Sequence, residues 1–341
     1  MRRQAHLIGS VGLRDAETVF TTVAEILGPC CSRIPDGETG DRAYWIRWQQ
    51  DAFASHPSFA PASTTRSLPG FADQIERTFF KLADHADPAE LAFGGMGYAW
   101  EAIESYRTFD RLAGEGKIGA DKRFQVALPT PVALLCGFIV PDDRRAVEPA
   151  LEAAIIAELH HIERAVPGTR LSIQWDVCFE VVAAEGGFRL PYADAIAGSV
   201  ERIGRLCREV DDAVELGIHL CYGDAGHRHL IEPSDLAISV AFANGISRAC
   251  ARRLDFLHMP VPRDRVDEAY FAPLQRLQLP ARTRLILGLV HYSDGVEGAR
   301  RRMAAAQRYA REFDIAAECG LGRRDPATIP ELLRIHRELC R

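Results

Sequence analysis

Two short segments of the sequence carry side chains that bind metal ions well. His219 and Cys221 lie two residues apart in the segment IHLC, and Cys319 directly follows the segment IAAE. Residues two apart in a β-strand point to the same side, so this imidazole and this thiol could reach one ion. Zinc prefers such nitrogen and sulfur ligands, and a third ligand commonly comes from another strand end. The pattern indicates a zinc-type site, whereas an HxC triplet alone is more often part of an ordinary core.

Acidic residues form a second group of candidates. Asp36 and Glu38 lie in the turn PDGETGDR, where two carboxylates could hold a substrate ammonium or act as an acid and base pair. A turn closed by an Asx-type bond is the alternative for this segment. Asp176 ends the apolar segment SIQW, where a buried charge is costly unless it faces a polar cavity. We therefore expect Glu38 and Asp176 to have catalytic or substrate-binding roles.

Three further polar residues end apolar segments. Ser10 and Thr130 follow LIG and ALP, and we expect both to contact a substrate. His291 follows GLV and could be a general acid or base, because imidazole titrates near neutrality. A hydrogen-bonded histidine at the rim of the fold is the alternative. Cys178 is expected to be a small core residue, and His229 a solvated loop residue.

Strand ends are informative because of the fold that the sequence predicts. Short β-rich apolar segments alternate with long amphipathic segments, which is typical of repeated βα units around a parallel sheet. Eight strands are predicted, at residues 5–10, 31–35, 124–128, 171–177, 217–221, 254–258, 285–290 and 313–318. Helices are predicted at residues 16–27, 147–164, 192–215, 233–242, 296–311 and 330–340. This α/β pattern predicts a (β/α)8 TIM barrel, in which active sites form at the carboxyl ends of the strands.

Residues 51–122 interrupt the alternation. They include a segment rich in Pro, Ser and Thr at 57–69, a helical pattern at 70–82 and an aromatic-rich segment before residue 110. We expect a single barrel domain over residues 1–341. In it, residues 51–122 form an insertion over the barrel mouth or an extended βα connection. A separate small domain is the alternative.

Composition limits the partners. The 341 residues include 41 basic and 47 acidic side chains, for a net charge of −6, and they form no long basic block for nucleic acid or an anionic membrane. A small molecule is therefore the expected partner, with the oligomeric state left open. Nine cysteines with irregular spacing and no export signal predict a reduced, cytoplasmic protein.

The strand ends together resemble the catalytic barrel of cobalamin-independent methionine synthase and its short relatives, in the superfamily that includes uroporphyrinogen decarboxylase. The resemblance rests on the segments IGS, DGETGDR, PTPVALL, IQWD, HLCYGD and AECGLGRR. It implies zinc ligands at His219, Cys221 and Cys319, and it implies that Ser10, Glu38 and Asp176 hold an amino acid substrate. It also implies transfer of an alkyl group to a thiol, because zinc in this family lowers the pKa of a substrate thiol.

Two departures from the family pattern change the expected reaction. His258 stands where the synthases have a glutamate ligand, so the resemblance implies a fourth metal ligand there and a less anionic, stronger Lewis acid. Gly137 stands near the position of the tryptophan that stacks on folate. We therefore expect a zinc-dependent enzyme that transfers or cleaves an alkyl group, methyl included, without methyltetrahydrofolate. A zinc-assisted lyase or hydrolase, or a barrel that binds a ligand without turnover, are the alternatives.

Overall fold

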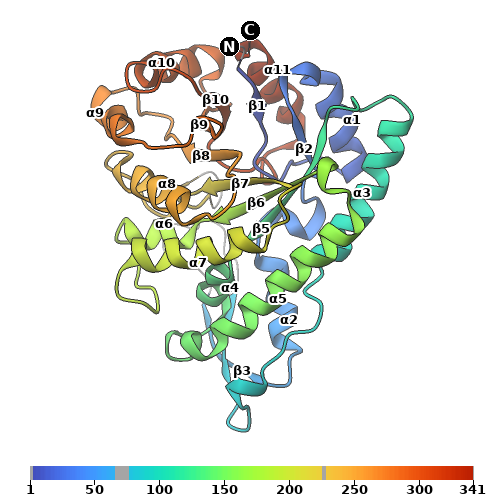
Figure 1. The fold of residues 1–341 in the computed structure, drawn as a ribbon, viewed down its shortest axis with the longest axis vertical. Coiled ribbons are helices and arrows are strands. Elements are labelled where there is room, and N and C mark those ends of the chain that lie inside the picture. Colours follow the sequence, from blue (N-terminus) through green and yellow to red (C-terminus); the bar gives the residue numbers. More distant parts are fainter. Residues whose placement is uncertain (1–2, 66–76, 225–227, 341) are drawn as a thin grey trace.

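A computed structural model describes residues 3–65, 77–224 and 228–340 (Figure 1). Eight parallel strands form one sheet in the order β1-β10-β9-β8-β7-β6-β5-β2. Their bounds are Ala5–His6 for β1, Arg33–Pro35 for β2, Arg123–Pro129 for β5, Leu171–Val177 for β6, Glu215–Leu220 for β7, Phe256–Pro260 for β8, Arg284–Val290 for β9 and Asp314–Ala317 for β10. Each of these strands overlaps one of the eight predicted apolar segments.

The sheet closes on itself between its two end strands. A parallel bridge joins Ser10, just after β1, to Gly37, just after β2, and the Val11 amide donates to the Gly37 carbonyl at 2.7 Å. The prediction of a (β/α)8 barrel is therefore confirmed.

Helices surround the barrel between consecutive strands (Figure 1). Their bounds are Ala16–Ile26 for α1, Tyr98–Gly114 for α3, Pro131–Phe138 for α4, Arg144–Ala165 for α5, Phe179–Ala184 for α6, Ala195–Glu209 for α7, Ala237–Ala249 for α8, Glu268–Phe271 for α9, Gly295–Gln307 for α10 and Ile329–Leu339 for α11. The helix predicted over 192–215 is too long at both ends, because the Asp194 carboxylate caps the helix start and Glu215 already belongs to β7. The helix predicted at 233–242 begins later, at Ala237, and extends to Ala249.

Residues 51–122 contain both an addition to the barrel and one of its regular helices. Helix α2 (Gln50–Ala54) precedes an antiparallel hairpin of β3 (Phe59–Thr65) and β4 (Arg77–Leu82). The hairpin lies against α4, because Phe80 bridges Ile139. Helix α3 packs against α1 and α5, as a barrel helix does. The segment is thus an extended βα connection that carries a hairpin.

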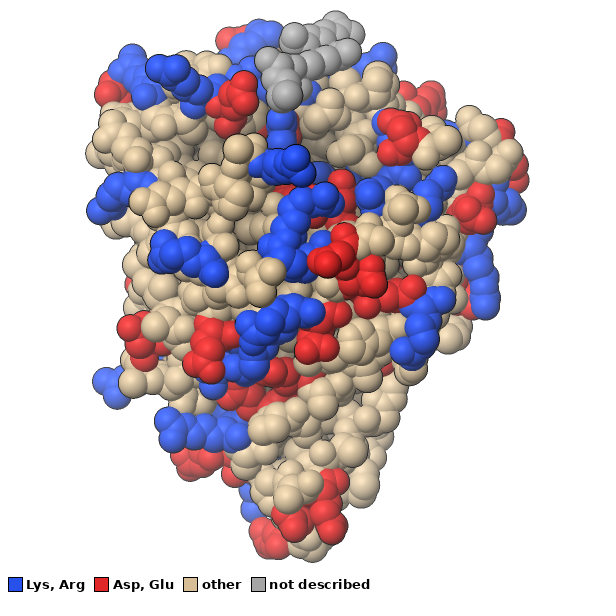
Figure 2. All heavy atoms as spheres, viewed as in Figure 1, with Lys and Arg blue, Asp and Glu red and all other residues tan. Residues whose placement is uncertain are grey.

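The helical prediction over 70–82 is wrong for residues 77–82, which form strand β4. Its remaining part, residues 70–76, lies outside the described residues. In the described ranges, none of the helices is long and apolar enough to cross a membrane. Basic and acidic side chains are interspersed over the face drawn in Figure 2.

Candidate metal centre and active site

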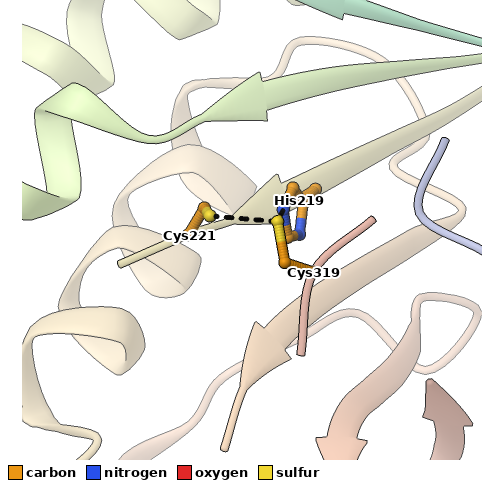
Figure 3. A group of neighbouring side chains, drawn as sticks. All are labelled: His219, Cys221 and Cys319. Atoms are coloured by element: carbon orange, nitrogen blue, oxygen red, sulfur yellow. Dashed lines mark hydrogen bonds between the residues drawn. The ribbon is translucent and has the colours of Figure 1, made fainter. Parts of the chain in front are cut away.

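The register of the strands brings the candidate ligands together. Asp176 on β6 is the neighbour of His219 on β7, which in turn is the neighbour of His258 on β8. Cys221 follows the end of β7, and Cys319 follows the end of β10. The His219 Nε2 atom lies 4.0 Å from the Cys319 Sγ atom, and the two sulfur atoms lie 3.7 Å apart (Figure 3). Ligand atoms from all three residues lie within 4.8 Å of one another.

The two distances from the Cys319 sulfur atom fit a zinc ion. Tetrahedral zinc with bonds of about 2.3 Å to sulfur and about 2.05 Å to nitrogen places two sulfur ligands about 3.8 Å apart and a sulfur and nitrogen about 3.6 Å apart. The observed sulfur separation of 3.7 Å matches the first value, and the 4.0 Å from nitrogen to sulfur is close to the second. Hydrogen bonding to neighbouring thiols and burial raise the pKa of both Cys221 and Cys319. Both thiols would therefore ionise only beside a cation.

The tautomer of His219 follows from a chain of hydrogen bonds behind it. His258 Nε2 lies 3.1 Å from the Ala317 carbonyl oxygen, which can only accept, so this nitrogen carries the proton. His258 Nδ1 is then an acceptor, and it lies 2.8 Å from His219 Nδ1. His219 therefore donates from Nδ1 and keeps the lone pair of Nε2 for the metal.

His258 thus lies behind His219, and it is not in the group of three residues whose ligand atoms converge. Both of its ring nitrogens have partners, the His219 ring and the Ala317 carbonyl. Burial lowers the pKa of His258 to about 3 and also lowers that of His219. Both rings are therefore neutral, as the hydrogen-bond chain requires. This placement suits a residue that orients a ligand.

The turn after β2 places the Glu38 carboxylate. The Asp36 carboxylate accepts from the Glu38 amide at 2.9 Å, which closes an Asx-type turn. Glu38 takes a left-handed backbone conformation with φ of 45°, a strained geometry that is most common at functional sites. A side chain at Gly9 would place its Cβ atom 2.5 Å from the Glu38 Oε1 atom. The glycine of the IGS segment therefore leaves room for this carboxylate.

Glu38 and Asp176 form a pair of carboxyl groups that are not both ionised at neutral pH. Burial, together with the charges of Asp176 and Asp36, raises the pKa of Glu38 to about 8. Burial likewise raises the pKa of Asp176 to about 7, against a hydrogen bond of 2.9 Å that it accepts from the Gln174 amide. A cationic group bound between them would favour ionisation of both. A neutral Glu38 could instead donate a proton.

One cavity, partly open to solvent, connects the metal ligands with the carboxyl groups. It is lined by six of the predicted site residues, namely Ser10, Glu38, Asp176, His219, Cys221 and Cys319. Thr130, His258 and His291 are not among the residues that line it. The structure therefore brings together the residues that the motifs emphasised most strongly.

Thr130 and His291 have structural partners of their own. The Thr130 hydroxyl caps α4 by accepting from the Ala133 amide, and it donates to the Glu180 carboxylate at 2.6 Å. His291 donates from Nε2 to the Val261 carbonyl at 2.9 Å, while its Nδ1 lies 3.8 Å from the Glu318 carboxylate. These contacts are those of a helix cap and of a hydrogen-bonded histidine at the rim.

The loop that carries Cys319 is anchored on two sides. The Ser10 hydroxyl accepts from the Gly322 amide at 3.2 Å, and the Ser10 carbonyl accepts from the Leu321 amide at 2.6 Å. Arg323 pairs with Asp224 at 3.0 Å, which ties this loop to the segment after Cys221. Ser10 therefore lines the cavity and also fixes the position of a metal ligand.

Several residues of the site escaped the sequence analysis. Cys178 lines the cavity and its side chain hydrogen-bonds with Cys221, so it is not simply a core residue. His229 is buried and contacts Glu318 at 3.1 Å, so the prediction that it is solvated is wrong. Burial lowers its pKa, but the hydrogen bonds and charges of Glu318 and Glu232 together outweigh burial and raise the value to about 9. Arg47 and Arg77 also line the cavity.

Ile46 fills the space at Gly137, near the position where the resembling synthases have a folate-stacking tryptophan. A Cβ atom on Gly137 would lie 2.7 Å from the Ile46 Cδ1 atom, because Ile46 packs directly over the glycine. Aromatic side chains line the cavity elsewhere, where Trp45 meets Phe179 edge to face with ring centres 5.5 Å apart. The apolar wall of the cavity is therefore formed by other residues, among them Trp45 and Phe179.

Comparison with known proteins places this site in a wider context. The sequence matches no protein-family model and no curated protein. A B12-independent methionine synthase from Shewanella sp. W3-18-1, in complex with selenomethionine, superposes with a TM-score of 0.63 at 12% identity, covering 100% of this chain and 97% of the other. The chain shares the fold of this methionine synthase. A methyltransferase from Methanosarcina mazei is also similar, with a TM-score of 0.57 at 12% identity over 99% of this chain and 94% of that one.

The methionine synthase-like fold extends over the whole chain, including the extended connection at residues 51–122. At 12% identity, the activity of this chain must be argued from its own site.

Proposed function

We propose that this protein is a zinc-dependent enzyme that transfers or cleaves an alkyl group, methyl included, on a small organic substrate. The observation that carries the proposal is the convergence of His219 Nε2 with the sulfur atoms of Cys221 and Cys319 in the lining of the cavity. The shared fold and the motifs, which resemble those of the methionine synthase-like family, support it.

Each residue has a role that follows from its chemistry. His219, Cys221 and Cys319 would hold zinc, which when bound acts as a Lewis acid and lowers the pKa of a substrate thiol. His258 would act as a positioning residue that fixes the His219 tautomer. Glu38 and Asp176 would bind the ammonium group of an amino acid substrate, since both face the cavity and a cation offsets their mutual repulsion.

The alkyl donor in this proposal is not methyltetrahydrofolate. In this chain Ile46 occupies the space over Gly137 where an aromatic side chain would stack on a pterin. The cavity wall of Trp45 and Phe179 favours another apolar group.

A zinc-assisted lyase or hydrolase is the second candidate, and one observation favours it. A Glu38 carboxyl group that titrates near pH 8 is protonated at neutrality and can donate a proton to a leaving group. His291 could take part only if it turned away from Val261 and toward the cavity.

Metal analysis of the purified protein tests the proposal directly. We expect close to one equivalent of zinc in the wild type and a large loss in Cys221→Ser and Cys319→Ser. The matched control is Cys340→Ser, because Cys340 is a buried cysteine directly after the last helix. Less than about a tenth of an equivalent in protein purified without chelator would refute it. After cobalt substitution, a change of the visible spectrum on adding homocysteine favours transfer to a thiol. An unchanged spectrum favours the lyase or hydrolase.

A further inference from the structure

Four arginines lie around the cavity, and they fall into two classes. Arg42 pairs with Asp36 at 2.9 Å and with Glu101 at 3.2 Å. Arg323 pairs with Asp224 at 3.0 Å. Within the described part of the chain, Arg47 and Arg77 have no carboxylate at ion-pair distance, although both line the cavity. Two positive charges at this wall are therefore not neutralised by a carboxylate of residues 3–65, 77–224 or 228–340.

The two unpaired arginines are held by aromatic rings. The Arg77 guanidinium lies 5.9 Å from the centre of the Phe138 ring, and that of Arg47 lies 5.7 Å from the centre of the Tyr44 ring. Such stacking occupies the faces of a guanidinium and leaves its N–H edges available for hydrogen bonds. The Arg77 Nη1 atom is buried without a hydrogen-bond partner among the described residues. A buried donor of this kind calls for an acceptor.

The environment of Arg77 also favours an anion. Burial and the charge of the neighbouring Arg47 lower the pKa of Arg77 to about 10, so the side chain stays charged at neutral pH. Two like charges that are close together repel each other, and a bound anion would relieve this repulsion. Their elements differ, since Arg47 follows the turn of Glu38 whereas Arg77 begins β4 of the hairpin. The cavity wall between these elements includes Trp45, Ile46 and Phe179.

We propose that Arg47 and Arg77 form an anion-binding subsite that recognises a carboxylate, sulfonate or phosphonate group on the substrate. Oxygen atoms of such a group would accept from the free N–H edges of the two guanidinium groups, as bidentate arginine sites do. The apolar wall next to them would contact the carbon body of the same molecule. The inference rests on the proposed function only in that the ligand is the substrate of the metal site.

Calorimetric titration of the full-length protein as purified tests this subsite. The probes are 4-phenylbutanoate, 3-phenylpropane-1-sulfonate and 3-phenylpropylphosphonate, with the neutral 4-phenylbutanamide for comparison. We expect at least one anion to bind about tenfold or more tightly than the amide, because charged hydrogen bonds contribute on this scale. The preferred anion identifies the group recognised.

Variants test whether the two arginines cause the preference for anions over the amide. Arg77→Gln and Arg47→Gln should each reduce the ratio of anion to amide affinity toward one, whereas Arg77→Lys should retain part of it. Arg300→Gln is the matched control, because Arg300 pairs with Glu297 and Glu338 on an exposed helix surface. If Arg77→Gln fails to fold, the exposed Arg47→Gln still decides the question.

Three results would overturn the proposal. They are no saturable binding of any anion at millimolar concentration, equal affinity for amide and anions, and an anion preference that survives both glutamine substitutions. The titration requires no turnover and can be repeated after chelation of metal. Failure of the metal proposal and failure of the anion subsite are therefore distinguishable.

Discussion

Substitution of His258 by alanine tests the hydrogen-bond chain behind the metal site. Metal binding requires the Nε2 lone pair of His219, so Nδ1 must carry the proton in the metal-bound state. In the wild type this proton is donated to His258 Nδ1 at 2.8 Å. In the variant it has no partner once metal is bound, whereas metal-free His219 can move its proton to Nε2. The substitution therefore destabilises the metal-bound state more than the metal-free state.

The expected size of the effect can be worked out in two ways. An unsatisfied buried donor costs about 1–3 kcal/mol. Loss of the residue that orients a metal-bound histidine typically weakens metal affinity by about 10- to 100-fold, or about 1.4–2.7 kcal/mol. The two ranges agree, so we expect the zinc dissociation constant of His258→Ala to rise by about one to two orders of magnitude.

Competition with a chromophoric chelator measures this dissociation constant. His336→Ala is the matched control, since His336 is a fully buried histidine of α11 that lies away from the cavity. It should lose stability without losing zinc affinity. A His258→Ala affinity within twofold of wild type would refute the hydrogen-bond argument. A loss as large as that of Cys221→Ser would show instead that His258 is a ligand, as the family resemblance implies.

Three further outcomes are expected. Burial raises the pKa of Glu38 to about 8, so the stability that its protonated carboxyl group contributes is complete near pH 4 and is lost as the pH rises through 8. Melting curves should therefore show that the stability of Glu38→Gln increases relative to that of the wild type from pH 5 to pH 9. A difference in stability that stays constant over this range would contradict the prediction. A Cβ atom on Gly217 would lie 1.9 Å from the Phe256 ring, so Gly217→Ala should cost about 1–3 kcal/mol in urea denaturation and Phe256→Leu should restore part of it. Because Ile46 fills the space over Gly137, methyltetrahydrofolate should show no saturable binding by fluorescence, and micromolar binding would contradict the proposed donor class.

The barrel and its metal ligands could be predicted from local features of the sequence. Buried parallel strands are continuous apolar segments, so each appears in the sequence without knowledge of its partners. The two-residue spacing of His219 and Cys221 fixes their common direction through the pleat of the strand itself. The prediction of Cys319 as a ligand required only the general property that active sites of barrels lie at the carboxyl ends of strands.

The rest of the site depends on contacts that no local pattern encodes. The position of His258 behind His219 follows from the register between β7 and β8. Thr130 follows its strand as the motif suggested, yet its hydroxyl caps the first turn of α4 and does not line the cavity. Strand β4 was misread as helix because it pairs with β3 outside the barrel. Arg77 reaches the cavity only through this hairpin.

The bridge between Ser10 and Gly37 lies between the loop of Cys319 and the acidic turn, and it is a weaker junction than the ladders elsewhere in the barrel. The metal ligands belong to β7 and β10, whereas Glu38 belongs to the turn that follows Gly37. Other neighbouring strands of the sheet share two or more residue pairs, whereas the segments after β1 and β2 share this single bridge. A shift on the Gly37 side of this junction would change the span between the acidic turn and the sulfur ligands, while Ser10 keeps its contacts with the Cys319 loop. The length of substrate that such a barrel accepts could therefore diverge in evolution while its metal chemistry stays constant.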